Sequence, residues 1–143
     1  MTDSKAYYRK LRHYKYQLMQ DYTISIETET EEDIETSFIV LTTDGELTIK
    51  NRYAWDGPSG PTTDTKSFMR GSLVHDALYQ LMREGHLDHQ EHREYADDLL
   101  KKICIKDGMS MVRAWYVHKS VRKFGEKHAR PSPKPQDEII CVP

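Results

Sequence analysis

Cysteine is scarce in this sequence, because only Cys104 and Cys141 occur among its 143 residues. Two thiols cannot form the framework of several disulfides that stabilises small secreted domains, so we expect reduced cysteines in a cytosolic setting. Long apolar runs are also missing, since no stretch approaches the ~20 residues that a membrane-spanning helix needs. The basic N-terminus has no apolar segment of the kind found in secretory signal peptides. The sequence therefore predicts neither a signal peptide nor a transmembrane segment.

Glycine-rich functional motifs are missing as well. The sequence contains no G-x-x-x-x-G-K-[ST] loop, no G-x-G-x-x-G fingerprint and no G-x-S-x-G elbow. Phosphate-loop enzymes, dinucleotide-binding proteins and serine hydrolases with a nucleophile elbow are therefore not expected. Hydrophobic residues make up 37% of the chain and charged residues 31%, which is enough apolar material for one modest core.

Charge is distributed unevenly, although the net charge is only −2. Residues 27–35 carry six acidic side chains and are too polar to pack, so we expect a solvated hairpin tip there. Residues 101–130 carry nine basic side chains against Asp107 and Glu126. This region could bind an acidic partner such as membrane lipid or nucleic acid, or it could be a solvated helix face. We favour the solvated face, and nucleic acid is not the partner we expect.

The first half of the chain is typical of β-structure. Segments of alternating or β-branched residues occur at 13–19, 22–28, 36–42 and 46–50. Asp44-Gly45 supplies a turn between the last two of them. These features predict an antiparallel β-meander within about residues 13–56.

The second half has helical periodicity. Helices are expected from about Ser67 to Gly85, from about Leu87 to Lys106, and from a Ser110 cap to about Lys127. Met111, Ala114, Val117 and Val121 form the expected inward face of the third helix. The predicted fold class is therefore α+β, with a β-meander followed by three helices in a single domain over residues 1–128 and a Pro-rich tail over 129–143.

A candidate site emerges from the helical half. His75 and Tyr79 are one turn apart on the flank of the apolar stripe, whereas Asp76 points about 100° further round. Asp97 flanks the stripe of the next helix and is better placed than Asp98 to meet His75. A carboxylate bonded to one imidazole nitrogen fixes the tautomer and leaves the other nitrogen free as a base.

Two further features bear on this site. The segment Trp55–Gly60 is rich in glycine and proline and can turn backbone carbonyls inward, which together with Asp76 are the hard oxygen ligands that calcium prefers. Arg93 lies four residues before Asp97 and could hold that carboxylate in an ion pair instead. The alternative is purely structural: a packed histidine, a solvated Asp76 and a rigid turn.

Other candidates have simpler explanations. His118 lies on an apolar stripe and is expected to be a core histidine. Trp115, Tyr116 and Phe124 lie among basic residues and could stack on bases, but aromatic residues at helical spacing are more often part of the core. Cys104 falls on a buried helix face, so a cysteine nucleophile is not supported.

The strings YAWDGPSGPTTDTKSFMRGSLVHDALYQLMREG, REYADDLL and GMSMVRAWYVHKSVRKFG resemble a family of small phage and prophage proteins, the domain of unknown function numbered 1353. The resemblance covers roughly residues 13–125. It implies a phage or prophage origin, with the protein in the host cytoplasm during infection or in the virion. It implies no particular activity.

The site also resembles, more distantly, that of secreted calcium-dependent phospholipases. The shared pattern is a Gly-rich loop, a His-Asp-x-x-Tyr helix and a later helix carrying an Asp. The resemblance implies that His75 is the general base, Asp97 its orienting acid and Tyr79 a support for Asp97. It further implies calcium bound by Asp76 and by backbone carbonyls of Trp55, Gly57 and Gly60. The flanking cysteines of those enzymes are absent here.

These observations lead to two functional expectations. The first is a calcium-assisted lipid or acyl-ester hydrolase. The second is a non-catalytic virion, tail or lysis-associated protein, or a regulator that binds a host factor. Lipid or virion and tail proteins are the corresponding partners.

Overall fold

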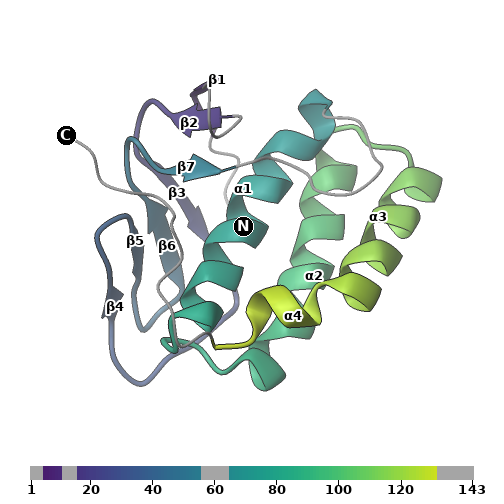
Figure 1. The fold of residues 1–143 in the computed structure, drawn as a ribbon. Coiled ribbons are helices and arrows are strands. Elements are labelled where there is room, and N and C mark those ends of the chain that lie inside the picture. The colour runs from purple at the N-terminus through teal and green to yellow at the C-terminus, as the bar shows by residue number, and fades with distance from the viewer. Residues whose placement is uncertain (1–4, 11–15, 56–64, 132–143) are drawn as a thin grey trace. The chain divides into compact units, whose positions relative to one another are not determined.

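Strands occupy the N-terminal half of the protein and helices the C-terminal half, which confirms the α+β class (Figure 1). The computed structural model describes residues 5–10, 16–55 and 65–131. Strands and helices belong to two compact units. We call the described residues up to Trp55 the strand unit and residues 65–131 the helix unit. The predicted domain boundary at residue 128 stays a prediction.

The strand unit contains two antiparallel sheets. The smaller sheet has the order β1-β2-β7, from β1 (Tyr8–Lys10), β2 (Tyr16–Leu18) and β7 (Ala54–Trp55). The larger sheet has the order β3-β6-β5-β4, from β3 (Tyr22–Ser25), β4 (Ile34–Glu35), β5 (Ile39–Leu41) and β6 (Glu46–Ile49). The expected meander is present as β4, β5 and β6, while β3 pairs with the other edge of β6.

Alternation of side chains explains the larger sheet. Leu47 and Ile49 of β6 are completely buried, whereas Thr48 between them points to the opposite face. There its hydroxyl lies 3.1 Å from the hydroxyl of Thr23, its cross-strand partner on β3. One face of the sheet is thus apolar and the other is partly polar.

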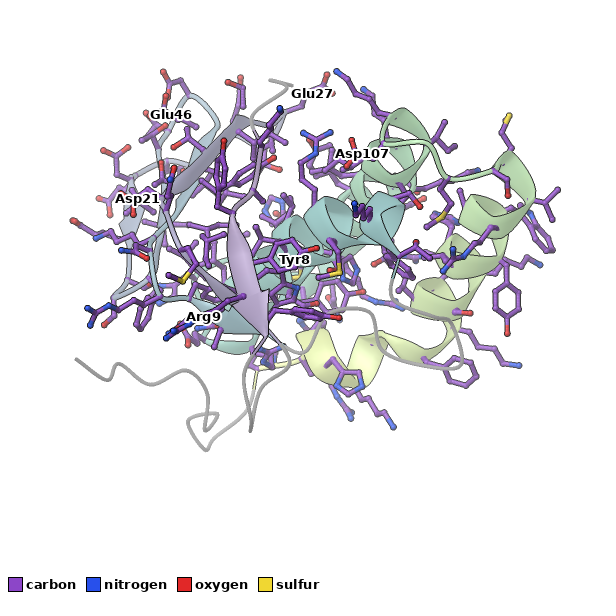
Figure 2. All side chains as sticks on the ribbon, turned by 90° about the horizontal axis from the view of Figure 1, so that it is seen from above. Tyr8, Arg9, Asp21, Glu27, Glu46 and Asp107 are labelled. Atoms are coloured by element: carbon purple, nitrogen blue, oxygen red, sulfur yellow. The ribbon has the colours of Figure 1, made fainter. Side chains whose placement is uncertain are left out.

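The acidic run at residues 27–35 is not the tip of a hairpin, as the sequence suggested. It connects β3 and β4, which lie at opposite edges of the larger sheet. All six of its acidic side chains are exposed, so the expectation of a solvated segment is confirmed. The prediction of a hairpin was wrong because the charge pattern indicates solvent exposure and contains no information about strand order. Glu27 belongs to this run, and Asp21 and Glu46 are further exposed acids of the strand unit (Figure 2).

The helix unit consists of three long helices and one short helix, α1 (Lys66–Arg83), α2 (His89–Lys106), α3 (Met111–Phe124) and α4 (Glu126–Ala129). Side chains cap two of them at their N-termini: Asp88 accepts a hydrogen bond from the amide of Gln90, and Ser110 accepts one from the amide of Arg113. α2 packs between α1 and α3, and α4 returns to contact α1 (Figure 1).

Gly71 allows α1 and α2 to approach closely. A Cβ atom at this position would lie 2.9 Å from Cys104 Sγ and 3.0 Å from Leu100 Cδ1. Leu100 and Cys104 belong to the core of the unit, together with Phe68, Met109, Ala114 and Val117. A bidentate ion pair adds to this contact, since Arg70 Nε and Nη2 bind the two oxygens of Asp107 at 3.0 and 2.8 Å. Asp107 caps the C-terminus of α2 (Figure 2).

The third predicted helix differs from the observed one in two respects. It is divided at Gly125 into α3 and α4, and Ala129 at the end of α4 is fully buried. Met111 was expected to face inward, but it is exposed at the first position of α3. Only Ala114 and Val117 of α3 are buried, so its apolar seam is narrower than the periodicity indicated. None of the helices in the described part of the chain is both long and apolar enough to cross a membrane.

Candidate active site

The buried carboxylate of Asp97 is the centre of the candidate site. Its exposed fraction is 0%, although a lone carboxylate in such a place would be strongly destabilising. Three side chains compensate for this burial: His75 and Tyr79 come from α1, and Arg122 comes from α3. The site therefore joins all three long helices of the helix unit (Figure 1).

Each oxygen of Asp97 has its own partners. Oδ1 lies 2.7 Å from His75 Nε2 and accepts a hydrogen bond of 2.6 Å from the Tyr79 hydroxyl. Oδ2 accepts a hydrogen bond of 2.9 Å from Arg122 Nη1 and lies 3.9 Å from Arg93 Nε. Charge-assisted bonds of this length are among the strong ones in proteins. The carboxylate is thus fixed in both position and orientation.

The local sequence explains how α1 presents two ligands to one carboxylate. His75 and Tyr79 are four residues apart, so they lie one above the other on the same face of the helix. Their ring centroids are 4.1 Å apart. Gly125, at the end of α3, makes room for this pair, because a Cβ atom there would lie 2.6 Å from the Tyr79 hydroxyl.

Arg93 supports the site without replacing His75. Its Nε donates to the Tyr79 hydroxyl at 3.2 Å, and its Nη2 donates to the backbone carbonyls of Val121 and Arg122. The guanidinium therefore joins α2 to the last turn of α3. From the sequence, Arg93 was expected to compete with His75 for the carboxylate of Asp97. The shorter arginine contact to that carboxylate instead comes from Arg122.

The electrostatics of the cluster favour the charged forms of His75 and Asp97 and the neutral form of Tyr79. Burial alone would lower the pKa of His75, but hydrogen bonding and the negative charges of Asp76 and Asp97 raise it above its ordinary value of 6.5. Burial tends to raise the pKa of Asp97, yet its bonds to His75, Tyr79 and Arg122 bring it below its ordinary value of 3.8. The pKa of Tyr79 is raised by burial and by Asp97, so its hydroxyl stays protonated and donates.

These directions assign the tautomer of His75. Asp97 is ionised and can only accept, so Nε2 must carry the hydrogen of their bond. When the imidazole is neutral, Nδ1 then carries a lone pair. Asp76 Oδ1 lies 3.9 Å from Nδ1, so the carboxylate of Asp76 is close to the basic nitrogen. The arrangement thus provides an oriented base with an acid beside it.

The predicted calcium ligands are only partly described. The side chain of Asp76 is 36% exposed and offers the oxygen ligand that calcium prefers. Trp55 belongs to β7 of the strand unit, and Gly57 and Gly60 lie outside the described residues. Across residues 5–10, 16–55 and 65–131, no three His, Cys, Asp or Glu side chains are grouped to hold a metal ion.

Trp55 has a structural environment within its own unit. Its side chain is buried, and its ring packs against those of Tyr8, Tyr16 and Tyr53 at centroid distances of 5.8, 5.7 and 6.4 Å. β7 pairs Trp55 with Tyr16 of β2. The Trp55 ring thus packs among aromatic rings of its own unit, at the β7 edge of the smaller sheet.

Two other expectations have clear outcomes. His118 is not a core histidine, because its Nε2 lies 2.7 Å from Asp98 Oδ1 in a partly exposed pair between α3 and α2. Trp115, Tyr116 and Phe124 are exposed, so the expectation that they belong to the core was also wrong. Cys104 is buried as predicted, and burial together with the charge of Asp107 raises the pKa of its thiol to about 12. Such a thiol is a poor nucleophile.

The structure brings His75, Tyr79 and Asp97 together, and it adds Arg122, which sequence reasoning missed. The wheel positions of α1 and α2 contained the signal for the first three residues. Arg122 carried no such signal, because its contact depends on how α3 crosses α2. No family model, curated protein or solved structure matches the chain.

Proposed function

We propose that this protein is a calcium-assisted hydrolase of lipid or other acyl esters, with His75 as its general base. The observation that carries the proposal is the 2.7 Å bond between His75 Nε2 and the buried Asp97, which leaves Nδ1 with a lone pair beside Asp76. A histidine held in this way is suited to abstract a proton from water. The resemblance to calcium-dependent phospholipases gives the proposal its substrate class.

In the proposed reaction, Nδ1 of His75 takes a proton from a water molecule whose oxygen attacks the carbonyl carbon of the ester. Asp97 stabilises the resulting imidazolium through Nε2, in keeping with the raised pKa of His75. Collapse of the tetrahedral intermediate breaks the bond to the alkoxide, and His75 returns the proton to that leaving group. Tyr79 and Arg122 hold Asp97 in place throughout.

Asp76 would be the side-chain ligand of calcium in this proposal. Calcium supplies Lewis-acid stabilisation of the developing oxyanion when it is bound. The exposed fraction of Asp76 and its position beside His75 Nδ1 support that role. The proposal also places the protein in phage infection, on the basis of the family resemblance.

The alternative is a non-catalytic virion, tail or host-factor-binding protein, and one observation favours it. Arg122 neutralises the second oxygen of Asp97. The buried cluster can therefore have a purely structural role, in which it holds the three long helices together. In that case His75 would donate to Asp97 only for stability.

Hydrolysis measurements on the full chain separate the two functions. The wild type is tested on short-chain acyl esters and on phospholipids in mixed micelles, with calcium and with a chelator. His75→Gln removes the base while its amide can still donate toward Asp97, so the variant should stay folded and lose at least a hundredfold in rate. His118→Gln is the matched control, because it alters a histidine–aspartate pair of the same length outside the site.

We expect calcium-dependent hydrolysis in the wild type and in His118→Gln, and a rate at least about a hundredfold lower in His75→Gln. If the folded wild type hydrolyses none of these esters in the presence of calcium, the proposal is contradicted and a purely structural role of the cluster is favoured. Equal hydrolysis by wild type and His75→Gln would remove His75 from the reaction.

A further inference from the structure

The exposed side of α3 is unusually apolar in its first two turns. Met111, Val112, Trp115 and Tyr116 are 70%, 79%, 51% and 47% exposed. Met111 and Trp115 are four residues apart, as are Val112 and Tyr116, and Val112 and Trp115 are three apart, so these side chains are neighbours on the helix surface. Single apolar residues on a surface are common, whereas contiguous exposed apolar patches are typical of surfaces that bind another protein or a membrane.

The same helix is basic and free of acids. Its 14 residues include Arg113, Lys119, Arg122 and Lys123 and contain no Asp or Glu, although the whole chain has a net charge of −2. Lys119 and Lys123 are exposed and follow the apolar group along the helix. We define the α3 outer face as Met111, Val112, Trp115, Tyr116, Lys119 and Lys123.

We propose that the α3 outer face docks on the surface of an anionic lipid bilayer. Trp and Tyr side chains sit well at a membrane interface, where one end is apolar and the other is hydrated. Met111 and Val112 can enter the acyl boundary, while the two lysines reach anionic head groups. The proposal goes beyond hydrolysis, because docking requires neither His75 nor calcium.

The contacts on α3 favour lipid over nucleic acid. Stacking on bases needs an open aromatic face, yet Lys119 Nζ lies 4.9 Å above the Trp115 ring. Lys123 Nζ lies 5.4 Å from the centroid of Phe124, at the end of the same helix. The most exposed members of the face, Met111 and Val112, are aliphatic and offer no stacking surface.

The charges also disfavour a second copy of the chain. An isologous contact through this face would bury Lys119 and Lys123 of each copy against a helix that contains no Asp or Glu, so four lysines would lose water without gaining an acidic partner from α3. An anionic bilayer instead supplies the opposite charge and an apolar layer beneath it. Both halves of the α3 outer face then find a complementary environment.

Flotation with vesicles tests the inference on the full chain. Vesicles of phosphatidylcholine alone are compared with vesicles that contain about 30% phosphatidylglycerol, an anionic lipid that gives the vesicle a negative surface potential. His75→Gln is used beside the wild type, so that binding is read without lipid turnover. We expect binding to the anionic vesicles, a steep loss of binding with added salt, and much weaker binding to phosphatidylcholine.

Variants locate the surface. Trp115→Ala should weaken partitioning by about tenfold or more, from the lost burial of the indole. Reversal of both lysines, Lys119→Glu with Lys123→Glu, should weaken it by at least about tenfold on anionic vesicles. Tyr7→Ala and Lys102→Glu are matched controls, because they remove an exposed aromatic ring and an exposed lysine elsewhere. These controls should bind like the wild type.

Several results would overturn the docking surface. One is absence of binding to anionic vesicles at low salt, and another is binding that the α3 variants leave unchanged. A third is tighter binding to single-stranded DNA that Trp115→Ala abolishes, and a fourth is dimerisation through this face. Vesicle binding without ester hydrolysis would contradict the proposed function alone, so the two failures are distinguishable.

Discussion

His75 Nε2 lies 2.7 Å from Asp97 Oδ1, although the two residues are 22 positions apart on different helices. The contact orients the imidazole and at the same time neutralises a fully buried carboxylate. Structure and proposed chemistry therefore depend on the same bond.

Asp97→Ala should destabilise the protein by about 3–5 kcal/mol, because it leaves buried donors of His75, Tyr79 and Arg122 without their acceptor. Urea unfolding followed by circular dichroism measures the loss. Asp98→Ala is the control: it removes the partner of His118 in a partly exposed pair, and it should cost less than about 1 kcal/mol. Equal losses for the two variants would show that the buried network contributes no special stability.

The raised pKa of His75 has a defined effect on stability. The folded protein holds the proton more tightly than the unfolded chain, whose imidazole has the ordinary value of 6.5. The stabilisation is therefore fully present below about pH 6.5 and is lost as pH rises through the folded value. For Asp97 the sign is opposite: its contribution is present above 3.8 and is lost as pH falls through the lowered folded pKa. NMR titration of the imidazole should give a His75 midpoint above 6.5, and a midpoint at or below it would be inconsistent with the charged network.

The helix pair of the site could be predicted from the sequence because helical periodicity fixes which residues share a face. His75 and Tyr79 flank the stripe of α1, and Asp97 flanks that of α2. The connection between the helices is short, from Glu84 to Asp88, so the helices had to be neighbours. Those two facts suffice to bring the three side chains together.

The contributions of α3 and of the sheets could not be predicted in the same way. Arg122 reaches Asp97 only because of the crossing of α3 over α2, which periodicity does not determine. Met111 and Trp115 looked like core residues, since a pattern of apolar residues does not say whether a partner helix covers them. The order β3-β6-β5-β4 depends on pairing between distant strands, which turn signals do not specify.

Truncation should reveal the contribution of α4. A chain that ends after Lys127 loses Ala129, which is fully buried, and the carbonyl of His128, which accepts a bond of 3.1 Å from Arg83. A chain that ends after Pro131 keeps both. We expect the shorter chain to be less stable than the longer one by about 1–3 kcal/mol, from one buried methyl group and one hydrogen bond. Identical urea midpoints for the two chains would mean that α4 contributes nothing to the helix unit.

Calcium should stabilise the folded protein if Asp76 is part of a calcium site. A ligand that binds only the native state adds about 2.7 kcal/mol at one hundred times its dissociation constant. Thermal melts of the wild type at increasing calcium should therefore shift upward. Asp76→Asn should abolish the shift and cost less than about 1 kcal/mol without calcium, because the side chain is partly exposed and its contact with His75 is 3.9 Å long. His75→Gln should keep the shift, since the imidazole is assigned to proton transfer and not to the ion.

Asp98→Asn, at an exposed acid of α2, controls for general screening by a divalent cation. A wild type whose melting temperature does not respond to millimolar calcium would remove calcium from the proposed reaction, whereas a shift that persists in Asp76→Asn would move the site elsewhere in the chain.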